Sequence, residues 1–271
     1  MPKFAANLSM MFQEVGFLDR FDAAAGVGFR AVEYLFPYDF PPQALAERLK
    51  ASGLEQVLFN LPPGDWAAGE RGLAALPGRE VAFREGVQQA LEYARTLECR
   101  QVHAMAGIPP TGVPRETCEA VYVQNLRFAA EELKASGIRI LMEPINTRDM
   151  PGYFLNTVAQ ARQIREAVGS DNLFLQLDFY HCQVMEGDLA ERFKANLGWT
   201  KHVQIAGTPG RHEPDVGEIH YPYLFGLMDE LGYAGWIGCE YRPRGGTVVG
   251  LGWARRYGIG QPAQPEVGGQ L

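Results

Sequence analysis

Short apolar runs of the kind that form buried strands alternate with amphipathic helical stretches along the whole 271-residue chain. We predict strands in eight segments: 4–9, 31–36, 56–61, 101–106, 139–145, 173–179, 202–206 and 236–241. The clearest helices lie between them, at 79–97, 116–135 and 221–231. A strand followed by a helix, repeated eight times in a chain near the typical ~250 residues, predicts the α/β class and a single (β/α)₈ barrel over residues 1–257.

Spacing also predicts which helix faces are buried. The helix at 79–97 is expected to pack one apolar face on the barrel, formed by Val81, Val87, Leu91 and Ala94. An open, doubly wound sheet is the alternative fold, and it usually has a Gly-rich turn after its first strand. Here AAAGVGFR (23–30) follows a helical stretch, so neither a dinucleotide fingerprint nor a P-loop is predicted.

Two longer stretches with Gly and Pro, 62–78 and 207–220, are predicted to be loops on the barrel. The Gly- and Pro-rich stretch 258–271 is expected to be a C-terminal tail, because its composition does not support a packed element by itself.

Composition restricts the partners and the compartment. The formal net charge of −7 argues against a nucleic-acid binder, which normally carries a basic stripe. No apolar run approaches the roughly 18 residues that span a bilayer, and the N-terminal residues do not resemble a secretion signal. The four cysteines are scattered without a CxxC pair, which favours reduced thiols and a cytoplasmic location. A homo-oligomer is compatible with this composition.

Polar side chains lie at the carboxyl ends of four successive predicted strands. They are Glu143, Asp178, Gln204 and Glu240, at intervals of 35, 26 and 36 residues, each about one strand and helix. The strands of such a barrel all end at the same face, so we expect these side chains to converge there. A single carboxylate would more simply cap a helix or pair with an arginine. The shared register of four side chains favours a site.

Three carboxylates held close together repel one another unless a cation lies among them. Oxygen ligands are those that Mg²⁺ and Mn²⁺ prefer, so the sequence predicts such an ion at the barrel mouth. His181 follows Asp178 by three residues and is expected to contact the substrate. The other four histidines are interpreted as structural. Three aromatic residues, Phe12, Phe36 and Trp66, are candidates for the pocket wall.

At these residues the chain resembles the hydroxypyruvate isomerases, within the wider family of xylose-isomerase-like barrels. The resemblance runs from FAANLSMMF (4–12) to GCEYRP (238–243). Its most specific stretches are NLPPGDWAAGERG (60–72), MEPIN (142–146), DFYHCQVMEGDL (178–189) and HEPDVGEIHYPYLF (212–225).

The resemblance implies residue roles. The two glutamates that transfer protons in the family correspond to Glu143 and Glu240. The metal ligands of metal-bearing members correspond to Glu143, Asp178, Gln204 and Glu240. Sugar epimerases of the wider family have a histidine where this chain has Gln204, which matches the isomerase branch and suits a more loosely held, harder ion. The DNA-repair relatives use three zinc ions and many histidines, whereas this chain has five histidines.

The implied reaction interconverts hydroxypyruvate and tartronate semialdehyde (2-hydroxy-3-oxopropanoate) through an enediolate, an aldose–ketose type shift. One glutamate must accept a proton and the other must donate one. A cationic clamp is expected for the substrate carboxylate, and Arg211 and Arg71 are the candidates. The loop 62–78 is predicted to be a lid that brings Trp66 and Arg71 onto the substrate.

Two alternatives stay open. The same site would serve a 2-oxo-tetronate isomerase or a ketose 3-epimerase, because the sequence does not show the length of the pocket. A barrel that only binds its ligand is the other, and the intact pair of glutamates weighs against it.

Overall fold

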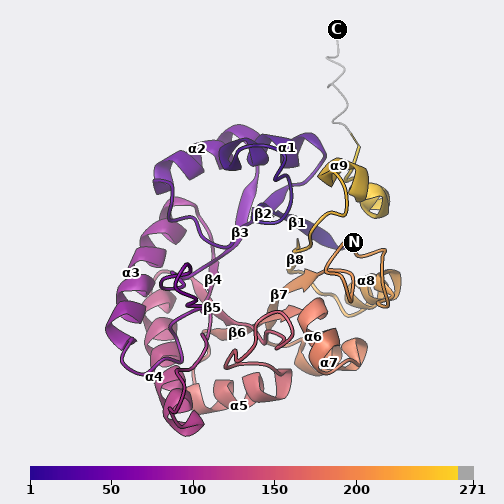
Figure 1. The fold of residues 1–271 in the computed structure, drawn as a ribbon. Coiled ribbons are helices and arrows are strands. Elements are labelled where there is room, and N and C mark those ends of the chain that lie inside the picture. Colours follow the sequence, from indigo (N-terminus) through magenta and orange to yellow (C-terminus); the bar gives the residue numbers. More distant parts are fainter. Residues whose placement is uncertain (262–271) are drawn as a thin grey trace, which may run out of the picture.

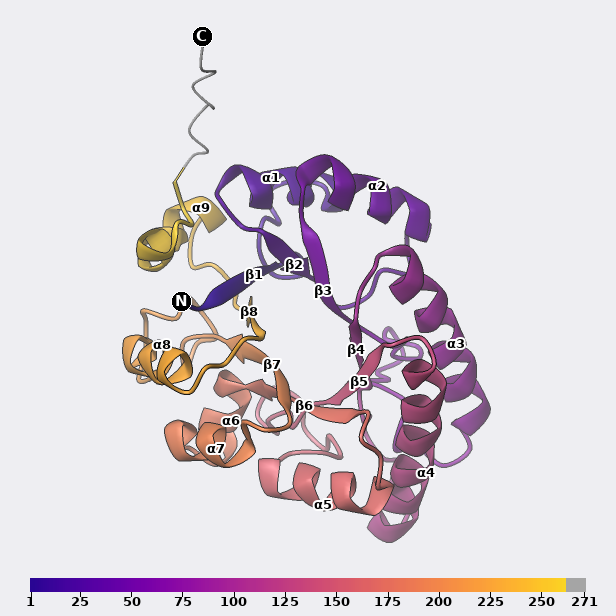
Figure 2. The same ribbon diagram turned by 180° about the vertical axis from the view of Figure 1, so that it is seen from behind.

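The computed structural model describes residues 1–261 and contains a closed barrel of eight parallel strands, with helices around the outside (Figures 1 and 2). The strands follow one another around the ring in chain order, and the last pairs with the first. Their bounds are β1 Lys3–Asn7, β2 Ala31–Glu33, β3 Glu55–Asn60, β4 Gln101–His103, β5 Arg139–Met142, β6 Leu173–Asp178, β7 Thr200–Ile205 and β8 Trp236–Cys239. All eight predicted strands and the (β/α)₈ barrel are confirmed.

The helices form the outer ring that covers the strands (Figure 1). Their bounds are α1 Arg20–Gly26, α2 Pro42–Ser52, α3 Glu80–Thr96, α4 Arg115–Lys134, α5 Val158–Val168, α6 Phe179–Met185, α7 Leu189–Asn196, α8 Tyr221–Glu230 and α9 Thr247–Gly250, with 3₁₀ helices η1 Phe17–Asp19 and η2 Leu251–Tyr257. The predicted helices at 79–97, 116–135 and 221–231 are therefore confirmed within a residue or two at each end.

For one residue of α3, the prediction of a buried side chain is wrong. Val87, Leu91 and Ala94 are buried, but the side chain of Val81 is 71% exposed. At about 100° per residue, Val81 lies roughly 120° around the helix from Val87, outside the stripe that faces the barrel. It belongs to the first turn of α3 and points to solvent.

The two predicted loops differ in how firmly they are held. In 62–78, residues 72–76 are buried and residues 65–69 are exposed. Gly72 has φ +111°, and a Cβ there would overlap the carbonyl of Met105, so only glycine fits this close approach. In 207–220, a bridge between Gly207 and His212 closes the first turn of the loop.

The predicted tail 258–271 is described only in part. Ile259 is buried, and the backbone N–H of Gly260 donates to the carbonyl of Val27. Residues 262–271 lie outside the described residues. Within 1–261, no helix has both the length and the apolar content needed to cross a membrane.

Parallel pairing places the polar strand ends at one face of the barrel. Asp178 is the Cα partner of Gln204, and Gln204 is the Cα partner of Gly238. Glu143 and Glu240 each come one residue after their strands, β5 and β8. The barrel therefore delivers these side chains to the same mouth.

Candidate active site

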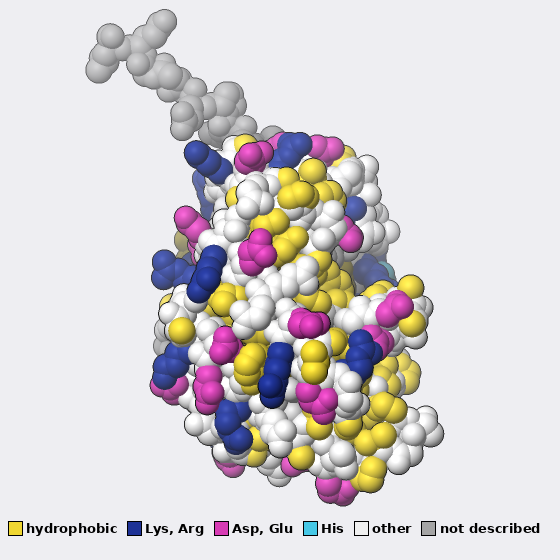
Figure 3. Space-filling model, turned by 90° about the vertical axis from the view of Figure 1, so that its left-hand side faces the viewer, with side chains coloured by type: hydrophobic (Ala, Val, Ile, Leu, Met, Phe, Trp, Pro, Cys, Tyr) yellow, Lys and Arg dark blue, Asp and Glu magenta, His cyan; other side chains and the backbone are white. Residues whose placement is uncertain are grey.

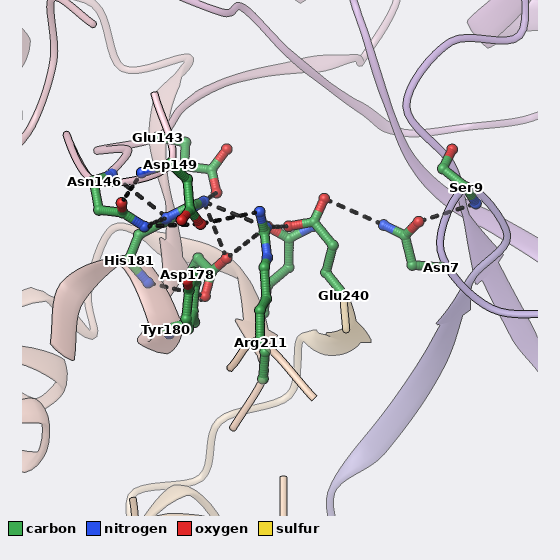
Figure 4. Close-up of polar contacts among 12 residues, drawn as sticks. Asn7, Ser9, Glu143, Asn146, Asp149, Asp178, Tyr180, His181, Arg211 and Glu240 are labelled. Carbon is green, nitrogen blue, oxygen red and sulfur yellow. Dashed lines mark hydrogen bonds and ion pairs between the residues drawn. The ribbon is translucent and has the colours of Figure 1, made fainter. Parts of the chain in front are cut away.

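Four acidic or imidazole side chains meet at the barrel mouth. Ligand atoms of Glu143, Asp178, His181 and Glu240 all lie within 4.8 Å of one another, and all four residues are buried (Figure 4). Asp178 ends β6, Glu143 and Glu240 directly follow β5 and β8, and His181 lies in the first turn of α6. The predicted convergence of Glu143, Asp178 and Glu240 is therefore present, with His181 beside them.

Asp178 has two tasks, one for each carboxylate oxygen. Its Oδ1 caps α6 by accepting hydrogen bonds from the backbone N–H groups of Tyr180 (2.7 Å) and His181 (3.4 Å). Its Oδ2 accepts no hydrogen bond from the described residues. Asp178 therefore caps α6 with one oxygen and offers the other oxygen to the site.

Arg211 places a positive charge among the carboxylates. One guanidinium nitrogen, Nη2, lies 2.6 Å from Oε2 of Glu240 and 3.5 Å from Oδ2 of Asp178 (Figure 4). The residue has φ +55°, a left-handed conformation that is uncommon for a side-chain-bearing residue. Its carbonyl accepts a 2.8 Å hydrogen bond from the backbone of Arg242, which fixes this turn of the loop.

A chain of hydrogen bonds sets the tautomer of His181. The backbone N–H of Asp149 donates to Oδ1 of Asn146 (2.8 Å), so the Asn146 amide nitrogen faces the other way. That nitrogen donates to Nδ1 of His181 (2.6 Å). Burial lowers the pKa of His181 well below its usual value, so the ring is neutral. Two donors on Nδ1 place the ring proton on Nε2, which lies 3.5 and 4.0 Å from Asp178 and Glu143, and its 3.4 Å contact with Nη2 of Arg211 is then not a hydrogen bond.

Burial dominates the acid–base properties of the three carboxyl groups. It raises the pKa of Glu143, with further increases from the neighbouring Glu240 and Asp178. Burial also raises the pKa of Glu240 to about 8, although Arg211 opposes the change. The pKa of Asp178 is raised for the same reason, and Arg211 again opposes the change. Glu240 therefore keeps its proton near neutral pH unless a cation enters the site.

This donor set fits a metal ion. Glu143 Oε1 and Asp178 Oδ2 are buried atoms that accept no hydrogen bond from residues 1–261. Arg211 offsets only one of the three negative charges when all three groups are ionised. An added cation would offset the burial and the mutual repulsion that raise these pKa values. Glu143, Asp178 and Glu240 could hold a metal ion, and His181 would join them through Nε2 only in its other tautomer, with the proton on Nδ1.

Gln204 lies beside this group with its side chain inside the barrel. Its Nε2 donates to Oε1 of Glu33 (2.8 Å), and its Oε1 accepts from Nε2 of Gln176 (2.6 Å). An amide oxygen has a second lone pair, so the predicted role of Gln204 as a metal ligand is compatible with these contacts and stays a prediction.

A cavity of about 480 Å³ opens above the carboxylates. Glu143, His181, Arg211 and Glu240 are among the residues that line it. Phe36, Trp66 and Arg71 line it from the loops, as predicted, whereas Phe12 is not among the lining residues. The guanidinium of Arg71 stacks 4.0 Å from the ring of Trp66 and donates to the carbonyls of Trp66 and Glu70.

Sequence reasoning missed several polar neighbours of the glutamates. His103, interpreted as structural, has Nδ1 at 3.6 Å from Oε2 of Glu143 and 3.2 Å from Oδ1 of Asn60. Asn7 donates to Oε1 of Glu240 at 3.5 Å. Each of these residues lies near the end of its strand, and this position was the only feature of the sequence that could have indicated a place at the barrel mouth. No spacing rule links them to the glutamates, because they come from other strands.

Comparison with known proteins identifies relatives along nearly the whole chain. The family described as xylose isomerase-like TIM barrel matches residues 21–257. A 2-oxo-tetronate isomerase of Cupriavidus necator is 59% identical over 257 residues, covering 95% of this chain and 99% of that protein. A hydroxypyruvate isomerase of Escherichia coli is 47% identical over 257 residues, covering 95% and 100%. A crystal structure described as AP endonuclease, family 2, from Brucella melitensis is 54% identical with a TM-score of 0.93, covering 95% and 99%.

Proposed function

Since the chain belongs to the xylose isomerase-like TIM-barrel family, and within it to the hydroxypyruvate and 2-oxo-tetronate isomerases, we propose that it isomerises a four-carbon 2-oxo acid, 2-oxo-tetronate. In this reaction the carbonyl group moves from C2 to C3 of the acid while the hydroxyl group moves the other way. The observation that carries the proposal is the 59% identity, over 95% of the chain, to a protein named for this substrate. The arrangement of Glu143 and Glu240 at one cavity supports the chemistry.

Glu143 and Glu240 are the proposed acid and base. One carboxylate removes the proton from C3, which gives an enediolate, and a carboxylic acid returns a proton to C2. The two groups have different surroundings, since Arg211 and Asn7 contact Glu240 whereas His103 approaches Glu143. Different surroundings allow one group to be ionised while the other keeps its proton, as the exchange requires.

Two further side chains serve the oxygens of the substrate. Negative charge develops on the oxygens of C2 and C3 as the proton leaves. Arg211 and the Nε2–H of His181 are donors that line the cavity beside both glutamates. Donors fixed in advance toward developing charge stabilise it most when water is excluded, and this part of the site is buried.

The proposed cofactor is Mg²⁺ or Mn²⁺, because most of the candidate ligand atoms are oxygens. Glu143, Asp178 and Glu240 would hold it, with Gln204 nearby, whereas His181 keeps its Nε2–H as a donor. Such an ion would supply Lewis-acid stabilisation of negative charge on the substrate oxygens.

Arg71 is the proposed partner of the substrate carboxylate. Arg211 was the other candidate, but its guanidinium already contacts Glu240 and Asp178. Arg71 lines the same cavity from the loop 62–78, and its planar group suits a carboxylate. Trp66 beside it would shield the acid from water.

The test uses purified protein, Mg²⁺ and each acid in D₂O, followed by NMR. We expect conversion of 2-oxo-tetronate with deuterium entering at the carbon that is protonated. Hydroxypyruvate is the second candidate, favoured by the 47% identity to a hydroxypyruvate isomerase. A higher kcat/KM for hydroxypyruvate would reverse the order of the two substrates. Absence of turnover and of deuterium exchange with both acids would contradict the proposed function.

We do not propose that this chain acts on nucleic acid, although the Brucella structure is described as an AP endonuclease. A protein that binds DNA needs clustered lysine and arginine side chains to neutralise phosphates. This chain has a net charge of −7. On the face that carries α3 and α4, acidic and basic side chains are interspersed (Figure 3).

A further inference from the structure

A fourth buried carboxylate, that of Glu33, lies inside the barrel at the end of β2, and the residue is 1% exposed. A carboxylate so deeply buried is costly unless several donors satisfy it. Three side chains do so. Asn7 and Gln204 donate to its Oε1 at 2.9 and 2.8 Å, and Nε2 of His202 lies 2.5 Å from its Oε2. Glu33 does not line the substrate cavity.

Space for this carboxylate is left by the neighbouring strand. A Cβ atom at Gly238 would overlap both carboxylate oxygens of Glu33. Gly238 lies in β8 opposite Gln204, two residues before Glu240. The strand that delivers one proposed catalytic glutamate therefore also makes room for Glu33.

Because three side-chain donors converge on its two oxygens, Glu33 acts as a hydrogen-bond acceptor and dictates how its neighbours are turned. The amide nitrogens of Asn7 and Gln204 must face it, so the oxygen of Gln204 lies on the other side of its amide, where Gln176 donates to it. Gln101 Nε2 lies 3.3 Å from Nδ1 of His202, which leaves the proton of that ring on the nitrogen facing Glu33.

The same arrangement reaches Glu240. Oδ1 of Asn7 accepts from the backbone N–H of Ser9 (3.1 Å), which agrees with the amide nitrogen facing Glu33. The amide nitrogen of Asn7 has two hydrogens and contacts Glu33 at 2.9 Å and Oε1 of Glu240 at 3.5 Å. Figure 4 shows Asn7 reaching from β1 toward Glu240 on the side opposite Arg211.

We infer that Glu33 is a positioning residue of the isomerase, an acceptor inside the barrel that orients the amide of Gln204 and, through Asn7, the carboxylate of Glu240. The inference rests on the proposed function of the same site. It assigns Glu33 no contact with the substrate and no proton transfer.

The first test changes the hydrogen-bonding groups of the Glu33 side chain without changing its size. Glu33→Gln keeps the size but gives the position an NH₂ group, so at least one of the three donors loses its acceptor. We expect kcat to fall ~10–100-fold, as for loss of a group that orients a site residue, with a KM change of at most about threefold. Glu33→Asp keeps the acceptor and should retain more kcat than Glu33→Gln. Wild-type kcat in Glu33→Gln, or a lower kcat in Glu33→Asp than in Glu33→Gln, would overturn the inference.

A second variant keeps the Glu33 side chain but moves its carboxylate out of position. Gly238→Ala puts a methyl group where the carboxylate lies and should lower kcat with little change in KM. Gly226→Ala in α8 is the matched control, because a Cβ there meets nothing within 4 Å. If Glu33→Gln does not fold, this pair decides the matter: equal kcat in Gly238→Ala and Gly226→Ala contradicts the inference.

A third measurement does not depend on activity. The side-chain amide NMR signals of Asn7 and Gln204, assigned by their loss in Asn7→Asp and Gln204→Glu, should lie downfield because the amides donate to a carboxylate. In Glu33→Gln they should move upfield. If the wild type turns over no acid, the proposed function fails, yet these signals still decide the inference, and unchanged signals would overturn it.

Discussion

At the scale of single residues, surroundings give two chemically identical glutamates different properties. Glu240 is held by Arg211 on one oxygen and approached by Asn7 on the other. Glu143 has one oxygen near His103 and another that accepts no hydrogen bond from the described residues. Burial raises the pKa of both, so the site stores protons that a more exposed pair of glutamates would have lost.

Glutamine substitutions test the acid–base pair. Glu143→Gln and Glu240→Gln keep the shape and an oxygen but cannot exchange a proton, so we expect each to lower kcat by ~10²–10⁴. Because the two groups act as a unit, the double variant should be little slower than the poorer single one. Turnover is measured by NMR with 2-oxo-tetronate, and unfolding midpoints verify the fold. Near wild-type turnover in either single variant would remove that residue from the mechanism.

The raised pKa of Glu240 also predicts a pH-dependent stability of the metal-free protein. The unfolded chain loses this proton near the usual value of 4.5, whereas the folded protein keeps it up to about 8. The stabilisation is therefore complete below pH 4.5 and is lost as the pH rises through about 8. We expect the free energy of unfolding in EDTA to fall between pH 5 and 8 by up to a few kcal/mol, since one pKa unit corresponds to about 1.4 kcal/mol.

Denaturant titrations at these two pH values measure the effect. In Glu240→Gln the decrease should be smaller than in the wild type, because the neutral amide does not titrate. Glu131→Gln, at an exposed position of α4, is the control and should behave as the wild type. Equal pH dependence in Glu240→Gln and Glu131→Gln would show that Glu240 is not the source.

At the scale of elements, the loop 62–78 combines an anchored half with an exposed half. Residues 72–76 are buried against the barrel, whereas 65–69 are exposed and carry Trp66 above the cavity. Such a division suits a lid that turns about its anchored end. Trp66 also packs on Phe36 at a ring distance of 5.3 Å, so the exposed half already touches the cavity wall.

If the loop 62–78 is a lid that brings Arg71 onto the substrate carboxylate, Arg71→Ala should weaken substrate binding. Loss of a charge-assisted hydrogen bond to the substrate carboxylate, a contact worth ~1.5–3 kcal/mol, should raise KM about tenfold to a hundredfold. Steady-state kinetics with 2-oxo-tetronate measure it. Arg84→Ala, whose guanidinium lies over Phe128 outside the cavity, should leave KM unchanged. Unchanged KM and kcat in Arg71→Ala would exclude the clamp and the lid together.

At the scale of the whole molecule, metal binding should stabilise the barrel, because the carboxylates that would hold the ion come from three different strand ends. An ion that binds only the folded form adds about 2.7 kcal/mol at a hundred times its Kd. We expect a higher unfolding midpoint with saturating Mn²⁺ than with EDTA. Asp178→Ala should abolish this difference, since it removes a candidate ligand. Identical midpoints of the wild type in Mn²⁺ and EDTA would contradict a metal site.

The sequence predicted the ring of strands because each strand and helix has its own local period. It also predicted Glu143, Asp178 and Glu240, because parallel strands of one barrel end at a common face. It did not predict the partners Asn7, Glu33 and His103, which reach the site from strands far away in the chain. The predicted burial of Val81 was wrong because this residue, in the first turn of α3, lies outside the stripe that faces the barrel.

The pairing of β1 with β8 has a consequence for folding during synthesis on the ribosome. Synthesis proceeds from the N-terminus, so β1 must wait for residues 236–239 before its second neighbour exists. Until then the nascent chain has Glu143 and Asp178 but neither a closed ring nor Glu240. The last strand to emerge completes the barrel and the active site in the same event. Any chain released before residue 236 therefore lacks both.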